Sequence, residues 1–165
     1  MQKAPKISFS KLLAKFPEIE LPVVLGEDDH HTFSTKNEPI PEALISHYLI
    51  FSGDPIDEFT EFVACFSLPD TKNFHAIVYW KAGLLTYEYV LHTFNKKGET
   101  IDRKVIGGTK VHENVTALTV ATIEEDGSII MAGGVSNNQD DVYDASTTES
   151  IQLELLPNGQ ILGTN

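Results

Sequence analysis

The distribution of apolar residues divides the chain into a short helical part and a longer part of alternating polarity. The first helix is expected over residues 8–16, where the apolar positions follow the helical period: Phe9, Leu12, Leu13 and Phe16. Pro17 ends this helix, because proline cannot continue one, and the next segment is predicted to be extended. A second short helix is expected from Pro41 to about Tyr48, since proline is favoured at the first helical position.

From Glu58 onward, apolar and polar residues alternate, which is the pattern of half-buried strands. Turns rich in Gly, Asn and Asp separate seven expected strands, with a short return at 160–162; the strands are 58–68, 73–82, 84–94, 99–107, 115–124, 128–135 and 148–156. Because short links join consecutive strands, the pairing is predicted to be antiparallel. We expect a single α+β domain over residues 1–165. Two short helices in residues 1–57 would pack on a curved antiparallel β-meander of about seven strands in residues 58–165, as a sandwich or a half-barrel.

The hairpin around Ala82-Gly83 indicates which residues share a face of the sheet. A two-residue turn there would place Trp80 opposite Leu85 and His75 opposite Val90. The apolar face, which we expect to line the core, carries Phe74, Ala76, Val78, Trp80, Leu85, Tyr87, Tyr89 and Leu91. The opposite face is therefore predicted to be the chemically active or solvated one.

Four side chains on that opposite face are candidate catalytic residues: His75, Tyr79, Glu88 and His92. Two imidazoles beside a phenol and a carboxylate could support general acid–base chemistry, because histidine titrates near neutral pH. The same residues are also typical of a solvated sheet face. The sequence leaves both interpretations open.

The segment LGEDDHHTFS raises the question of a metal site. Adjacent residues of an extended chain point to opposite sides, so His30 and His31 are poorly placed to share one ion. Asp29 and His31 could share a side, which makes them candidate ligands. We expect an exposed loop here first and a ligand site second.

A second acidic segment, residues 136–148, is expected to be a long surface loop. It carries three further candidate metal ligands: Asp140, Asp141 and Asp144. Hard cations prefer such oxygen ligands, but the ordered spacing of an EF-hand loop is absent. No resident metal and no cofactor are predicted.

The composition limits the partners and the compartment. The formal net charge of −12 opposes contact with nucleic acid or anionic lipid, because both are bound through Lys and Arg. Cys65 is the single cysteine, so no intrachain disulfide forms, as is usual in a reducing compartment. With no apolar run long enough for a leader or a membrane span, we expect a soluble cytoplasmic protein, or an envelope protein if a leader was removed.

Three stretches resemble a group of small bacterial proteins without an assigned function: FPEIELPVVLGEDDHHTFS, FHAIVYWKAGLLTYEYVLHTFNKKGETID and LELLPNGQI. In that group a short helical N-terminus with a Phe-Pro-x-x-x-Leu-Pro segment precedes a β-meander, in some members behind a lipoprotein leader. The resemblance implies the architecture and no active site.

The favoured function is a non-catalytic binding or interaction module whose acidic surface, or the 136–148 loop, engages a basic protein. An inhibitor or immunity-type protein for a basic toxin would have this size and sign of charge. The alternative is a small-molecule-binding protein or hydrolase that uses the His75, Tyr79, Glu88 and His92 face, with or without a metal. The oligomeric state is open.

Overall fold

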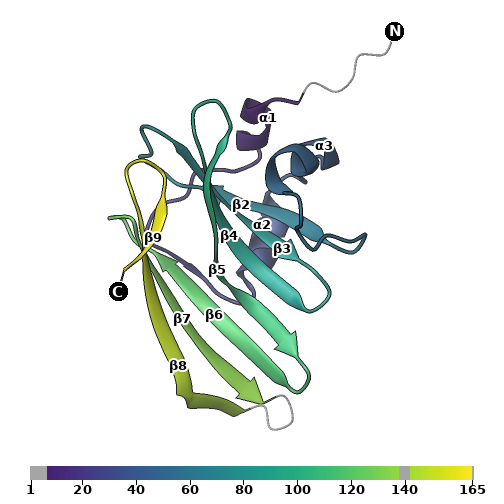
Figure 1. Cartoon of the computed structure of the whole chain (residues 1–165), viewed down its shortest axis with the longest axis vertical. Coiled ribbons are helices and arrows are strands. Elements are labelled where there is room, and N and C mark those ends of the chain that lie inside the picture. Colours follow the sequence, from purple (N-terminus) through teal and green to yellow (C-terminus); the bar gives the residue numbers. More distant parts are fainter. Residues whose placement is uncertain (1–6, 138–141, 165) are drawn as a thin grey trace.

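One antiparallel sheet forms most of the molecule (Figure 1). The computed structural model describes residues 7–137 and 142–164. In these residues nine strands pair in one sheet: β1 Val23–Leu25, β2 Glu61–Ser67, β3 His75–Ala82, β4 Thr86–Phe94, β5 Thr100–His112, β6 Val115–Ile123, β7 Ser128–Asn137, β8 Val142–Leu155 and β9 Ile161–Thr164. Strands β2 to β9 follow one another in sequence order, and β1 pairs with β6. The predicted meander is therefore confirmed.

The helices are short, so the chain is mainly β and the expected α+β class is too helical. They are α1 Phe9–Leu13, α2 Asp29–Lys36, α3 Glu42–Leu44 and the π-helical turn η1 Ile45–Leu49. Helix α1 lies inside the first predicted helix, and α3 with η1 occupies the second. Helix α2 was not predicted, and it begins within the acidic segment that was expected to be a loop.

The expected loop at 136–148 is also shorter than predicted. Strand β7 continues to Asn137 and β8 begins at Val142, because the two strands stay paired at Val135 and Asp144. Of the three acidic candidates there, Asp140 and Asp141 lie outside the described residues.

The β3–β4 hairpin confirms the predicted faces but not the predicted pairing. His75 lies opposite Phe94 and Trp80 lies opposite Tyr89, four residues further along β4 than a two-residue turn requires. The turn is longer because Gly83 N donates to Thr86 O, which leaves Leu84 and Leu85 exposed at its tip. An even shift moves no side chain to the other face, so the strand residues keep their predicted faces, whereas Leu85, which was expected on the core face, lies outside β4 and is exposed.

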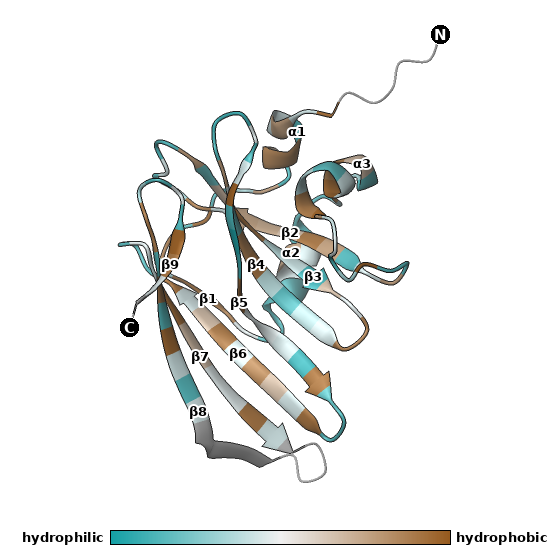
Figure 2. Cartoon of the chain, in the orientation of Figure 1, coloured by the Kyte–Doolittle hydropathy of each residue, from teal (hydrophilic) through white to brown (hydrophobic). Residues whose placement is uncertain are grey.

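The two faces of this hairpin lie in different apolar clusters. The first cluster lies inside the curved sheet and joins side chains of β2 to β4 with side chains of β6 to β9. The second lies between the hairpin and the N-terminal part of the chain, whose contributions include Leu12, Leu44 and Leu49 of the helices and Phe16, which follows α1. Figure 2 shows α1 largely in the apolar colour and α3 in mixed apolar and hydrophilic colours.

We call the side of β3 and β4 that carries Tyr79 and His92 the covered face, because the helices pack on it. The side that carries Trp80, Tyr87 and Tyr89 is the inner face. The helices explain why the covered face is not solvated. A helix with an apolar stripe must bury it against another element, and the sheet offers Ile77 and Val90.

A glycine pair lets β5 join the two halves of the sheet. Residues Thr100 to Lys110 of β5 pair with β4 and residues Gly108 to His112 pair with β6, so only Gly108 to Lys110 pair with both strands. Gly108 has φ +135, and a Cβ atom there would lie 1.9 Å from Tyr87 O. Only glycine allows so close an approach of two strands at this bend.

The N-terminal helices are not membrane spans. In the part of the chain that the structure describes, no helix combines the length and the apolar character needed to cross a bilayer.

Candidate functional site

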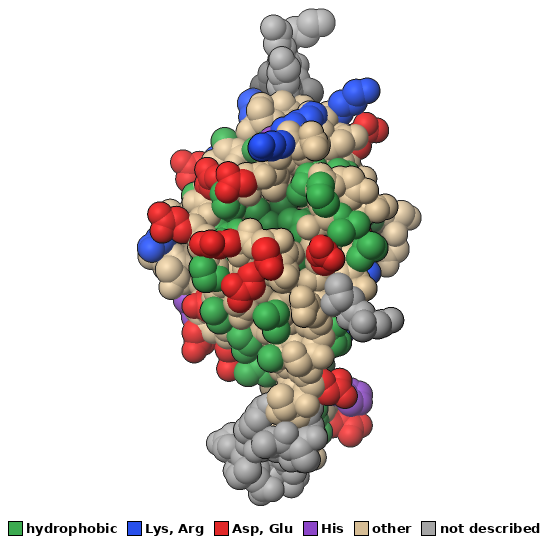
Figure 3. Space-filling model, turned by 90° about the vertical axis from the view of Figure 1, so that its left-hand side faces the viewer, with side chains coloured by type: hydrophobic (Ala, Val, Ile, Leu, Met, Phe, Trp, Pro, Cys, Tyr) green, Lys and Arg blue, Asp and Glu red, His purple; other side chains and the backbone are tan. Residues whose placement is uncertain are grey.

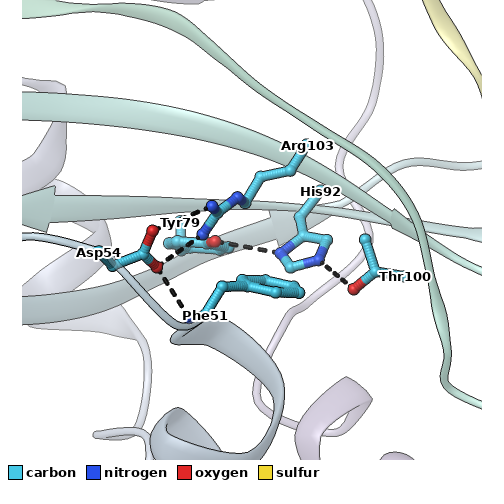
Figure 4. Close-up of polar contacts among 6 residues, drawn as sticks. All are labelled: Phe51, Asp54, Tyr79, His92, Thr100 and Arg103. Atoms are coloured by element: carbon cyan, nitrogen blue, oxygen red, sulfur yellow. Dashed lines mark hydrogen bonds and ion pairs between the residues drawn. The ribbon is translucent and has the colours of Figure 1, made fainter.

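A polar network lies buried on the covered face (Figure 4). His92 Nδ1 lies 3.1 Å from the Tyr79 hydroxyl, and His92 Nε2 lies 2.8 Å from Thr100 Oγ1. Strand pairing places Tyr79 and His92 diagonally on neighbouring strands, and Thr100 comes from the start of β5. His92 is 0% exposed and Tyr79 is 1% exposed, so neither side chain reaches solvent.

Burial fixes the protonation of this network. It lowers the pKa of His92 to about 3, with a smaller contribution from the positive charge of Arg103. Burial also raises the pKa of the Tyr79 phenol, so both groups are neutral near pH 7. A neutral imidazole has one donor and one acceptor nitrogen, which matches its two hydroxyl partners. The network is therefore satisfied without a ligand.

An ion pair closes the network from the outside. Arg103, which lies opposite His92 on β5, donates two hydrogen bonds to Asp54, at 2.9 and 3.1 Å. Its guanidinium carbon lies 4.3 Å from the centre of the Phe51 ring, and Asp54 also accepts from Phe51 N. The hydrogen bonds from Arg103 are the main cause that lowers the pKa of Asp54 to about 2.

Of the four catalytic candidates, the structure brings only two into contact. Tyr79 and His92 share a hydrogen bond, whereas His75 lies at the start of β3 against the Phe9 ring. Glu88 lies near the other end of the hairpin, opposite Lys81. Burial and the charge of Lys96 lower the pKa of His75. The predicted pocket on this face is instead occupied by the second apolar cluster.

Sequence reasoning missed Phe51, Asp54, Thr100 and Arg103. Arg103 is the only arginine of the chain, which was a usable signal, since the guanidinium group is well suited to partly buried ion pairs with carboxylates. Its partner Asp54 lies 49 residues away in an irregular loop, where no periodicity indicates a contact.

A cavity opens at the end of the inner face, beside the N-terminus of α2. Its volume is about 320 Å³, and its wall includes Glu27, Asp28, His30, Trp80, Tyr87 and Tyr89. The three β-strand aromatics were correctly predicted to face the core, but the end of that core is open. We call this site the aromatic cavity.

Helix α2 forms one wall of the aromatic cavity and is held at both ends. At its N-terminal end Tyr89 donates to Gly26 O at 2.9 Å, and at its C-terminal end Asn37 donates to the carbonyls of Ala64 and Cys65. Between them the rings of Phe33 and Phe66 lie 5.6 Å apart. The cavity wall is therefore tied to the sheet.

The two histidines of the acidic segment have different environments. The His30 ring stacks on Trp80, with centroids 4.0 Å apart and planes 3° from parallel, and its Nδ1 donates to Glu27 O. Burial, and then the neighbouring His31, lower the pKa of His30. His31 is exposed. The expected pairing of Asp29 with His31 assumed an extended chain and is wrong, because both lie in α2 and the Asp29 carboxylate accepts from Gly26 N.

A second, larger hollow lies at the other end of the sheet. We call it the acidic cleft: its volume is about 670 Å³, its wall includes Leu68, Phe74, Ile123 and Leu155, and four carboxylates belong to it, Asp70, Glu124, Glu125 and Asp126. Figure 3 shows this side of the molecule, where acidic side chains gather around exposed apolar ones and basic side chains lie toward one end.

The described residues of the two hollows do not form a group of side chains that could hold a metal ion. Among the described residues, no three His, Cys, Asp or Glu side chains come together in a group that could hold an ion. Cys65 is buried, and burial raises the pKa of its thiol, so it is not a reactive nucleophile.

The comparisons with known proteins add no relative. No family model, no curated protein and no solved structure matches the chain.

Proposed function

We propose that the chain is a non-catalytic binding module that engages a basic protein partner through the acidic cleft. The observation that carries this proposal is the cleft itself, which combines an apolar wall with four carboxylates and, among its described wall residues, no lysine or arginine. A basic amphipathic segment is complementary to such a surface. Its apolar side chains would enter the cleft while its lysines face the carboxylates.

The covered face supports a non-catalytic role. General acid–base catalysis needs a titratable group that reaches substrate, and Tyr79 and His92 are buried and hydrogen-bonded to protein groups. An inhibitor or immunity-type protein for a basic toxin is one form that such a module could take, since the net charge of −12 would steer a basic partner toward it.

The test uses a defined probe: a labelled 18-residue peptide of leucine and lysine with an amphipathic pattern, followed by fluorescence anisotropy. We expect binding that weakens as salt rises from about 50 to 300 mM, because exposed charges are screened. Glu124→Gln with Glu125→Gln should weaken binding about fivefold, whereas the exposed pair Glu42→Gln with Glu58→Gln should not. Equal binding by the two double variants would contradict the proposal, and so would equal binding of a leucine–glutamine peptide.

A further inference from the structure

The aromatic cavity has an acidic mouth and an aromatic floor. Glu27 and Asp28 are exposed where the chain enters α2, while Trp80 is 8% exposed and Tyr89 is 1% exposed at the bottom. Tyr87 lies between these levels and is half-buried, with its ring 6.0 Å from that of Trp80. A ligand in the cavity would therefore contact rings along its length and carboxylates at its entrance.

The charges around the cavity have one sign. Its described wall residues include no lysine or arginine, and neither Glu27 nor Asp28 has an ion pair with such a residue in the described part of the chain. His30 adds little positive charge near pH 7, because burial lowers its pKa. An anion would be repelled from this mouth.

We propose that the aromatic cavity binds an organic cation, with an alkylammonium or guanidinium group held between the carboxylates of Glu27 and Asp28 and the ring of Tyr87, above the floor that Trp80 forms. Aromatic faces attract cations through their quadrupole, and the attraction increases when water is displaced. The carboxylates supply charge-assisted hydrogen bonds to the N–H groups. The volume of about 320 Å³ suits a side chain or a small amine and excludes a folded element.

The site is organised before any ligand arrives. The hydrogen bond from Tyr89 to Gly26 O fixes the turn that carries the two carboxylates, and the stacked His30 ring fixes the position of α2 against Trp80. A fixed wall reduces the ordering cost of binding.

The inference is independent of the acidic cleft. Phe74 and Ile123 line the cleft, whereas Trp80 and Thr116 line the cavity, so the two sites lie at opposite ends of β3 and β6. Either site could bind its ligand if the other did not.

The test follows the indole N–H resonance of Trp80, the only tryptophan, by NMR of the full chain. The probe is Nα-acetyl-lysine N-methylamide, and its neutral counterpart is Nα-acetyl-norleucine N-methylamide. We expect a saturable shift with the lysine probe and at least tenfold weaker binding of the norleucine probe. The proposal would be overturned if the two probes bound equally, or if no probe saturated the shift. It would also be overturned if only methyl glucoside, a neutral sugar, saturated it.

Variants connect the signal to the site. Glu27→Gln with Asp28→Asn should weaken binding of the lysine probe about tenfold, and Tyr87→Leu should weaken it about fivefold. The matched control Glu42→Gln, exposed and outside the cavity wall, should bind as the wild type does. A further titration, with n-butylammonium, distinguishes the two sources of the cation. If n-butylammonium binds as tightly as the lysine probe, the ligand is a free amine; if it binds more weakly, the ligand is a side chain of a polypeptide. If all three variants bound the lysine probe equally weakly, the proposed location of the binding site would be wrong.

Discussion

The covered face and the inner face of the β3–β4 hairpin both carry tyrosine side chains, but the two faces have different surroundings. On the covered face Tyr79 and His92 bond to each other and to Thr100, under helices that exclude solvent. On the inner face Tyr87 and Trp80 end beside an open cavity with carboxylates at its mouth. Tyrosine rings occur on both faces, so what separates the structural network from the proposed binding site is whether other elements close the face to solvent.

The largest effect should follow removal of His92. We expect His92→Ala to lower the free energy of unfolding by about 3 kcal/mol, because it opens a cavity and leaves the Tyr79 and Thr100 hydroxyls without their partner. Urea unfolding measures this change. The exposed His112→Ala is the control, with an expected change below about 0.5 kcal/mol. If the two variants lowered the free energy of unfolding by similar amounts, the network on the covered face would not stabilise the fold.

The same histidine should make stability depend on pH. The His92 pKa is about 3 in the folded chain and near 6.5 when exposed, so the unfolded state binds the proton more tightly. The contribution of His92 to the free energy of unfolding is complete above pH 6.5. It decreases as the pH falls toward 3, by at most about 1.4 kcal/mol per pH unit. Asp54, with its pKa of about 2, adds a decrease only below about pH 4.

Unfolding curves between pH 7 and 4.5 test this dependence. His92→Gln keeps hydrogen-bonding groups but does not titrate, so its stability should fall less with pH than that of the wild type. Parallel profiles for the two proteins would show that His92 is accessible to protons in the folded state.

A pair of hydroxyl deletions compares the two faces directly. Tyr79→Phe should cost about 1–2 kcal/mol, since it leaves the buried His92 Nδ1 without a partner. Tyr87→Phe should cost less than about 0.5 kcal/mol, because its hydroxyl makes a 3.4 Å bond to Leu84 O at an exposed position. Thermal unfolding of both variants gives the comparison, and a reversed order would contradict it.

The smallest effect concerns the stack at the aromatic cavity. Protonated imidazole quenches indole emission, so Trp80 fluorescence should titrate with His30 and show a midpoint below 6.5. His31→Gln should raise the midpoint slightly, because it removes a neighbouring positive charge. His30→Gln should abolish the transition. A midpoint at or above 6.5 would mean that the His30 ring is not desolvated against Trp80.

Periodicity predicted the parts of the fold that depend on alternation. The strands after Glu58 and the faces of the residues within β3 and β4 follow from the period of two, which an even shift of register leaves unchanged. The register itself depends on the turn at Gly83, whose length alternation does not encode.

Helix α2 shows why some elements cannot be predicted from the spacing of apolar residues. Its contacts with the sheet come from His30, Phe33 and Asn37, so the spacing is helical but only one of the three is apolar. A search for apolar stripes cannot find it. The ion pair of Asp54 with Arg103 escaped for a related reason, since it joins a loop to a strand and follows no period.

The candidate sites were predicted only in part. The histidine and the phenol were correctly placed on one face, but the predicted register did not bring them together, and it put His92 beside His75 instead. Cover by the helices depends on tertiary packing that alternation does not show. The inner-face aromatics looked like core residues, and an opening at the end of a core is a property of the loops around it.

One measurement compares the two faces most directly: titration of the Trp80 indole resonance with Nα-acetyl-lysine N-methylamide in His92→Gln and in Tyr87→Leu. The account predicts that His92→Gln binds the probe as the wild type does, although it is less stable, and that Tyr87→Leu binds about fivefold more weakly. Weakened binding in His92→Gln together with unchanged binding in Tyr87→Leu would contradict it.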